Sequence, residues 1–347
     1  MRSLGWKHSW FVLVSVLFFG LLLQGCEPDK KDSRFQEVLL QGKTMGTTFT
    51  IKAFVPVSQI QSLNLYSDIT QILADVNQSM STYIPDSEIS RFNRSTDLTP
   101  FPISDDFRIV VAESIRLGKS TQTLDVTMGP LINLWGFGPD KHPDRVPSDD
   151  EIRAIKQRIG VDKLVLNEQG IAKTIPDLEL SFSAIAKGYG IDKVALFLEK
   201  QGLTNYMVEI GGELRISGTK ENNEPWTIAI EEPDVNLLQR AIHKTLHPGT
   251  MSVATSGDYR IYFEVDGVPY AHIISPTTGK PIIKDLVSVT VLNPSAMTAD
   301  GLATALVAMG TEKAKAYVEQ NNIPAYLISK TDKGLESFAS KAFAPYM

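Results

Sequence analysis

Apolar and polar positions along the chain predict helices and strands in an irregular order. Residues 48–55 have a strand-like composition with partial alternation, and residues 64–80 place apolar side chains on one helical stripe. Further helices are predicted at 104–117, 148–160, 183–200, 298–309 and 312–321, and further strands at 206–210, 226–230, 250–255, 260–265, 272–274, 287–292 and 325–329. No fixed repeat and no Pro- or Ser-rich linker divides them. We therefore expect a single α+β domain with a mixed β-sheet and surrounding helices.

The first 25 residues have the pattern of a secretion signal. Arg2 and Lys7 form a basic start, and residues 10–23 are apolar almost throughout but too few for a comfortable membrane span. The segment ends at Leu22-Leu23-Gln24-Gly25-Cys26, which is similar to the lipobox of bacterial lipoproteins, where cleavage leaves the cysteine as the lipid-bearing first residue. The alternative is a free or buried Cys26 after an ordinary signal.

These patterns predict three segments. Residues 1–25 are expected to be a lipoprotein signal peptide, residues 26–40 the lipidated cysteine with a flexible tether, and residues 41–347 the folded domain. Cys26 is the only cysteine, so no intramolecular disulfide is expected. The protein would then be lipid-anchored at the periplasmic face of a bacterial membrane, with the choice between inner and outer membrane open.

Composition narrows the function classes. With 347 residues and 43% hydrophobic residues, the chain can form an ample core. Its net charge of −6 argues against a nucleic-acid binder.

Asp300 and Thr304 lie four residues apart in a strongly helical pattern, which puts two hard oxygen ligands on one helix face. Such a pair suits Mg²⁺, which is usually completed by waters and substrate phosphates. Pro294 and Thr298 mark the helix start, so Asp300 is expected in the first turn, near free N–H groups that favour anions. The alternative is an aspartate that complements the helix dipole and a threonine that fills space.

Several other residues have both a chemical and a structural interpretation. Lys187, among small residues at 181–192, could hold a phosphate or be a solvated helix lysine. His272 could act as a base or pack at a strand start. Met45 and Tyr83 could lie against a planar ring or simply pack. The nearby glycines complete no dinucleotide fingerprint, so a Rossmann domain is not predicted.

Taken together, these segments resemble the ApbE family, the FAD:protein FMN transferases. The resemblance covers most of the chain after residue 44. It is carried, in chain order, by Thr44-Met45-Gly46-Thr47, Met80-Ser81-Thr82-Tyr83, Leu124-Asp125-Val126-Thr127, Leu134-Trp135-Gly136-Phe137-Gly138, Ala184-Ile185-Ala186-Lys187-Gly188-Tyr189, Ile210-Gly211-Gly212, Ser256-Gly257-Asp258-Tyr259, His272-Ile273-Ile274 and the stretch from Ala299-Asp300 to Thr304.

The resemblance implies a Mg²⁺-dependent enzyme that transfers FMN from FAD to a threonine hydroxyl of a target protein and releases AMP. The Mg²⁺ ligands it implies are Asp300, Thr304 and the Ala184 carbonyl, and His272 or Asp300 would accept the threonine proton. The FAD-contacting positions it implies are Met45, Tyr83, Thr123, Leu124, Asp125, Ser181, Lys187 and Ile273. Ser181 and Ser275 stand where the family commonly has aspartate, and the first change removes a charge from the FAD pocket.

The resemblance also implies partners. The targets would be threonine-bearing subunits of membrane redox complexes, such as the sodium-pumping NADH:quinone oxidoreductase and its relatives. There are two alternatives. One keeps the same site but uses water as acceptor, as an FAD pyrophosphatase that gives FMN and AMP, and the other, from a different class, is a non-catalytic periplasmic flavin-binding lipoprotein. A pair of metal ligands favours catalysis, since flavin capture needs no metal.

Overall fold

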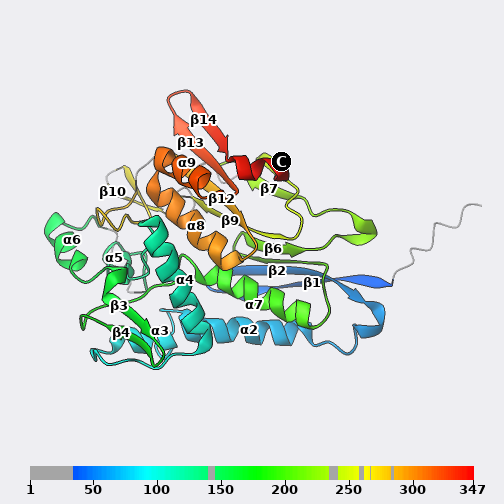
Figure 1. Ribbon diagram of the computed structural model, residues 1–347, viewed down its shortest axis with the longest axis horizontal. Coiled ribbons are helices and arrows are strands. Elements are labelled where there is room, and N and C mark those ends of the chain that lie inside the picture. The colour runs from blue at the N-terminus through cyan, green and yellow to red at the C-terminus, as the bar shows by residue number, and fades with distance from the viewer. Residues whose placement is uncertain (1–33, 140–144, 234–240, 258–261, 266, 283–284) are drawn as a thin grey trace, which may run out of the picture.

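The centre of the fold is an eight-stranded antiparallel sheet, with the strand order β1-β2-β5-β6-β9-β12-β13-β14 (Figure 1). The computed structural model describes residues 34–347 except 140–144, 234–240, 258–261, 266 and 283–284. The strands of this sheet are β1 (Phe35–Thr44), β2 (Thr47–Pro56), β5 (Tyr206–Ile210), β6 (Glu213–Ser217), β9 (Met251–Gly257), β12 (Leu286–Asn293), β13 (Ala325–Thr331) and β14 (Gly334–Ala339).

Helices and three small hairpins surround this sheet. The helices are α2 (Leu65–Met80), α3 (Glu88–Arg94), α4 (Asp105–Thr121), α5 (Gly129–Leu134), α6 (Asp149–Lys156), α7 (Ala186–Lys200), α8 (Ala296–Met309) and α9 (Thr311–Gln320). The hairpins pair β3 (Leu164–Asn167) with β4 (Gly170–Lys173), β7 (Ile228–Glu231) with β8 (Ile242–Leu246), and β10 (Tyr262–Val265) with β11 (Val268–Ala271).

Helix α8 lies at the heart of the domain. Nearly all of its residues are buried, because it packs against β9 and β12 on one side and against α4 and α7 on others. A helix that is apolar all round has no solvent face to present, so its sequence requires this central position. Figure 1 shows α7 and α8 side by side against the central strands. The opposite face of the sheet is covered by a second apolar cluster that includes Trp226, Leu246 and Phe343.

The structure confirms the α+β class and changes two predictions. The sheet is antiparallel at each described pairing rather than mixed. The tether prediction is wrong for residues 35–40, because β1 begins at Phe35 and pairs with β2. Strand β1 forms the edge of the sheet, is largely exposed and lacks alternation of apolar and polar residues, which hid it, although Val38 and Leu40 pack against the core.

The predicted signal peptide and Cys26 lie outside the described residues. Within the part of the chain that the structure describes, no helix has the length and apolar character to cross a bilayer. The predicted strand at 272–274 is reduced to one isolated bridge, between Ile274 and Pro281.

Helices α7 and α8 approach so closely that one position admits only glycine. A Cβ atom at Gly188 would overlap the backbone carbonyl of Ala296. We expect Gly188→Ala to force the two helices apart and to lower the free energy of unfolding by about 1–3 kcal/mol, measured by urea titration. Gly129→Ala is the matched control, because its nearest neighbour would be 3.5 Å away, an ordinary contact. Equal stability of the two variants would contradict this account of the helix pair.

Candidate functional site

A cavity of about 960 Å³ opens beside the start of α7. Its size is at the upper end for small-molecule sites. Five of the predicted site residues line it, namely Met45, Tyr83, Ser181, Lys187 and His272. They come from the β1–β2 turn, the segment after α2, the segment before α7, the first turn of α7 and the segment after β11, so residues far apart in sequence meet at one cavity.

Met45 reaches the cavity from a tight turn. The strands β1 and β2 are joined by Met45 and Gly46, whose φ angles of 49° and 72° are both left-handed. Two left-handed residues are what a two-residue hairpin requires, and Gly46 adopts this conformation without strain. A Cβ atom at Gly190 would lie 2.8 Å from the Met45 Cε, so the methionine also packs closely on α7. The turn therefore fixes an apolar side chain between the cavity and α7.

Tyr83 and His272 both line the cavity and both contact Phe137. The Tyr83 hydroxyl donates to the Phe137 carbonyl at 3.5 Å, and its side chain remains 67% exposed. The His272 ring meets the Phe137 ring edge-on, with centroids 6.4 Å apart. Ser181 also lines the cavity, and its hydroxyl donates to Ser183 Oγ at 3.3 Å. The wall thus combines an exposed aromatic ring with a titratable imidazole.

Lys187 connects this cavity to a buried pair of carboxylates. Its Nζ lies 3.1 Å from Glu213 Oε1 and 3.4 Å from Asp300 Oδ1. Asp300 is 1% exposed, and its Oδ2 accepts a hydrogen bond from the Gly188 backbone N–H at 3.0 Å. The residues come from α7, the first position of β6 and α8, and the close packing of α7 on α8 brings them together.

The charges in this cluster shift one another's pKa values. Burial raises the pKa of Glu213 and of Asp300, and the neighbouring Lys187 ammonium opposes both shifts. Burial alone would lower the pKa of Lys187, but the two carboxylates outweigh it and raise the pKa above its ordinary value. The lysine therefore stays cationic, and two acids with raised pKa values face this ammonium.

The predicted metal ligands lie close to this cluster. Asp300 is in the second turn of α8 rather than the first, because the helix begins at Ala296 with Ser295 as its cap. Thr304 follows one turn later, and its Oγ1 is 3.2 Å from Ser256 Oγ. Ala184 is partly exposed just before α7. Among the described residues, no three His, Cys, Asp or Glu side chains form a metal-binding group, so any site here would depend on hydroxyl and carbonyl oxygens as well.

The remaining predicted FAD residues do not line the described cavity wall. Thr123 donates to the Ala305 carbonyl at 2.8 Å, and Leu124 is buried in the core with Ile273. Asp125 accepts from the backbone and hydroxyl of Thr127 at 2.8 and 2.6 Å, and burial raises the pKa of this carboxyl despite those bonds. Thr123 thus contacts α8, and the contact of these four residues with FAD stays a prediction.

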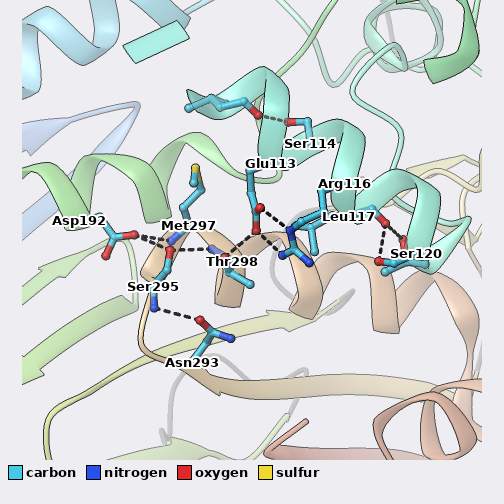
Figure 2. A network of polar contacts seen from close by, with 12 residues as sticks. Glu113, Ser114, Arg116, Leu117, Ser120, Asp192, Asn293, Ser295, Met297 and Thr298 are labelled. Carbon is cyan, nitrogen blue, oxygen red and sulfur yellow. Dashed lines mark hydrogen bonds and ion pairs between the residues drawn. The ribbon is translucent and has the colours of Figure 1, made fainter. Parts of the chain in front are cut away.

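A polar clamp, made by Asp192 and Ser295, holds the N-terminus of α8, and it was not predicted from the sequence (Figure 2). Asp192 on α7 accepts from the Ser295 hydroxyl at 2.8 Å and from the backbone N–H groups of Ala296 and Met297 at 3.0 Å each. Asp192 also forms an ion pair with Arg215 at 2.9 Å. The only sequence signal was an aspartate among the apolar residues of α7.

Helix α4 holds the same end of α8 from another side. Thr298 Oγ1 donates to Glu113 Oε1 at 2.6 Å, and Glu113 also pairs with Arg116 (Figure 2). The Ser295 backbone N–H donates to Asn293 Oδ1 at 3.0 Å. Because Asp300 follows directly on this end, these contacts set where its carboxylate lies relative to Lys187.

Comparisons with known proteins show the family of this chain. The family model described as the ApbE family matches residues 45–327. The chain belongs to the ApbE family. It is 48% identical to the FAD:protein FMN transferase of Vibrio cholerae over 98% of this chain and 99% of the relative, and 37% identical to that of Escherichia coli over 97% of each.

Solved structures of the family have the same fold. The flavin transferase ApbE of Vibrio cholerae superposes with a TM-score of 0.84 at 48% identity, covering 90% of this chain and 100% of that one. The apo form of the Pseudomonas stutzeri flavinyl transferase ApbE gives 0.81 at 37% identity, covering 90% and 96%. The predicted family and single-domain α+β fold are confirmed, and the protein is an enzyme of the transferase class.

The clamp at Asp192 makes a testable prediction. Asp192→Asn keeps the side chain's size but removes the charge that faces Arg215 and the helix N-terminus. We expect the free energy of unfolding to fall by about 2–4 kcal/mol, measured by urea titration. The control is Asp75→Asn, since Asp75 is exposed and accepts one side-chain bond, from Gln71. Equal effects of both substitutions would remove the role assigned to the clamp.

Proposed function

We propose that this ApbE-family enzyme is a Mg²⁺-dependent FAD:protein FMN transferase, which moves FMN from FAD onto a threonine hydroxyl of a target protein and releases AMP. The observation that carries the proposal is the position of Lys187. It lies in the wall of a cavity of about 960 Å³ and contacts two buried carboxylates behind that wall. Relatives named FAD:protein FMN transferase, 48% and 45% identical, support the reaction class.

The cluster behind the wall fits a cation. Among the described residues, Lys187 is the one ammonium that pairs with Glu213 and Asp300, and Glu213 Oε2 is buried without a hydrogen-bond partner. Burial disfavours the ionised form of both acids, so added positive charge would stabilise their carboxylates. Asp300, Thr304 and the Ala184 carbonyl would hold the ion. When bound, Mg²⁺ offsets the negative charge of the diphosphate and of the departing AMP.

Residues of the chain supply the remaining steps. The Lys187 ammonium attracts a diphosphate oxygen at the cavity wall. Met45 and the exposed ring of Tyr83 provide apolar surface for the isoalloxazine. The target threonine oxygen attacks the FMN-side phosphorus, its bond to phosphorus forms, and the bond from that phosphorus to the oxygen that leaves with AMP breaks. His272 in the cavity wall, or alternatively Asp300, accepts the threonine proton.

The proposed targets and location follow from the N-terminal pattern and the family resemblance. A lipid on Cys26 would tether the domain to the periplasmic face of a bacterial membrane. Threonine-bearing subunits of membrane redox complexes, such as the sodium-pumping NADH:quinone oxidoreductase, would be within reach there. Only chain segments that present a threonine at the cavity mouth could accept FMN.

A single assay separates transfer from hydrolysis. The purified protein is incubated with FAD, Mg²⁺ and a threonine-bearing target subunit, and flavin fluorescence on a denaturing gel is read together with free AMP. We expect a fluorescent target and AMP in equal amounts, and loss of both on addition of EDTA. AMP without a labelled target would indicate an FAD pyrophosphatase instead, and the absence of both products would reject an FAD-cleaving function.

Asp300 carries most of the proposed cation site. Asp300→Ala should lower FMN transfer at saturating FAD by at least about 100-fold, because a metal contributes several kcal/mol of transition-state stabilisation. Asp75→Ala, an exposed change on α2, should leave the rate unchanged. A rate within about twofold of wild type for Asp300→Ala would refute its assignment as a ligand.

Cys26 is the proposed lipidation site. Cys26→Ser should move the protein from the membrane pellet to the soluble fraction after cell lysis, because no other residue of the motif can carry the lipid. Ser33→Ala, a change in the same segment, should stay in the pellet. Membrane association of Cys26→Ser equal to that of wild type would exclude a lipid anchor at this residue.

A further inference from the structure

Glu213 is a buried acid that no motif or family position assigned. It opens β6, directly after Gly211 and Gly212, and is 6% exposed. Its Oε1 contacts the Lys187 ammonium at 3.1 Å, the shorter of the two contacts that this lysine makes with acids. Within the described part of the chain, its Oε2 has no hydrogen-bond partner. Burying a carboxylate with one oxygen unpaired lowers the stability of the fold, which suggests that Glu213 has a function.

The other acid, Asp300, differs from Glu213 in one respect. Its Oδ2 is held by the Gly188 N–H and its Oδ1 faces Lys187, so in this state both oxygens have a partner. If Asp300 is a metal ligand, as the proposed function requires, Lys187 competes with the cation for Oδ1. Two cations that share one carboxylate oxygen repel each other strongly at low dielectric.

We propose that Glu213 is a positioning residue, which holds the Lys187 ammonium at the cavity wall while Asp300 is committed to a divalent cation. This inference rests on the proposed function. Glu213 is the acid already in contact with Lys187, so the ammonium keeps an anionic partner when it leaves Asp300. It stays next to the cavity, where it meets the diphosphate. Glu213 thereby serves both cation binding at Asp300 and substrate binding at Lys187.

The account differs from a purely structural role, in which Glu213 would only stabilise the fold. Glu213 and Asp300 are two acids that face one ammonium, and Glu213→Gln leaves Lys187 paired with Asp300, so this variant is expected to unfold at the temperature of wild type. The account also differs from direct ligation, in which Glu213 would bind the cation itself and Lys187 would not be involved. In that case the effects of Glu213 and Lys187 substitutions on cation affinity would add. If Glu213 instead acts by holding the Lys187 ammonium, the two effects are coupled.

A double-mutant cycle tests this. Free Mn²⁺ is measured by electron paramagnetic resonance against the full-length protein in detergent, for wild type, Glu213→Gln, Lys187→Met and the double variant. We expect Glu213→Gln to weaken Mn²⁺ binding at least about 10-fold in the wild-type background. In the Lys187→Met background, the same substitution should weaken Mn²⁺ binding by a factor that is at least about five times smaller. Glu213→Gln should also raise the KM for FAD more than it lowers kcat.

The matched control is Glu209→Gln, on the paired strand β5, whose carboxylate accepts from Gly212 rather than contacting Lys187. It should bind Mn²⁺ as wild type does. If Glu213→Gln does not fold, Glu213→Met fills a similar volume and takes its place in the cycle. An equal loss of affinity in both backgrounds, or no loss in wild type, overturns the role of Glu213.

Failure of this inference is distinct from failure of the proposed function. Wild-type protein that binds Mn²⁺ and transfers FMN, alongside a Glu213→Gln variant with unchanged Mn²⁺ affinity, rejects the positioning role alone. Wild-type protein that neither binds Mn²⁺ nor transfers FMN rejects both.

Discussion

The close approach of α7 to α8 is the constraint on which the site depends. Gly188 lets the helix backbones meet, and its N–H donates to Asp300 across the contact. One turn further along α7, Asp192 binds the N-terminus of α8. The same two helices therefore carry the metal-ligand candidate, the cavity lysine and the clamp that aligns them. A shift between these helices would change the fold and the chemistry together.

Burial strengthens the electrostatic interactions among Lys187, Glu213 and Asp300. Asp300 and Glu213 share one ammonium in a region where water does not screen them. Such a cluster costs stability in the absence of a bound cation, and active sites commonly retain arrangements of this kind. The two acids do not line the cavity wall, while Lys187 lies in the wall itself. A cation and an anionic diphosphate would thus meet complementary charges at neighbouring positions.

Alternation and capping patterns in the sequence correctly predicted elements whose formation depends on neighbouring residues. The strand Tyr206–Ile210 and the capping box at Ser148 appear as expected, because alternation and capping are visible within a few residues. The edge strand β1 was missed, since its apolar residues do not alternate with polar ones and two of them, Phe35 and Leu39, are exposed. Glu213 and Asp192 were missed for a different reason. Their roles arise from contacts between distant segments, and the one local signal, the apolar residues around Asp192, does not reveal its partners on α8. The family resemblance supplied Lys187 and Asp300, which spacing alone left undecided.

The most direct test of the account is the anomalous scattering of Mn²⁺ in crystals of the protein grown with FAD. The account predicts an anomalous peak at the Asp300 carboxylate, with the FAD diphosphate beside it and the Lys187 ammonium on Glu213. A peak at another site, or no peak with Lys187 still on Asp300 and FAD bound, would contradict the central claim that this buried cluster is a divalent-cation site for FMN transfer.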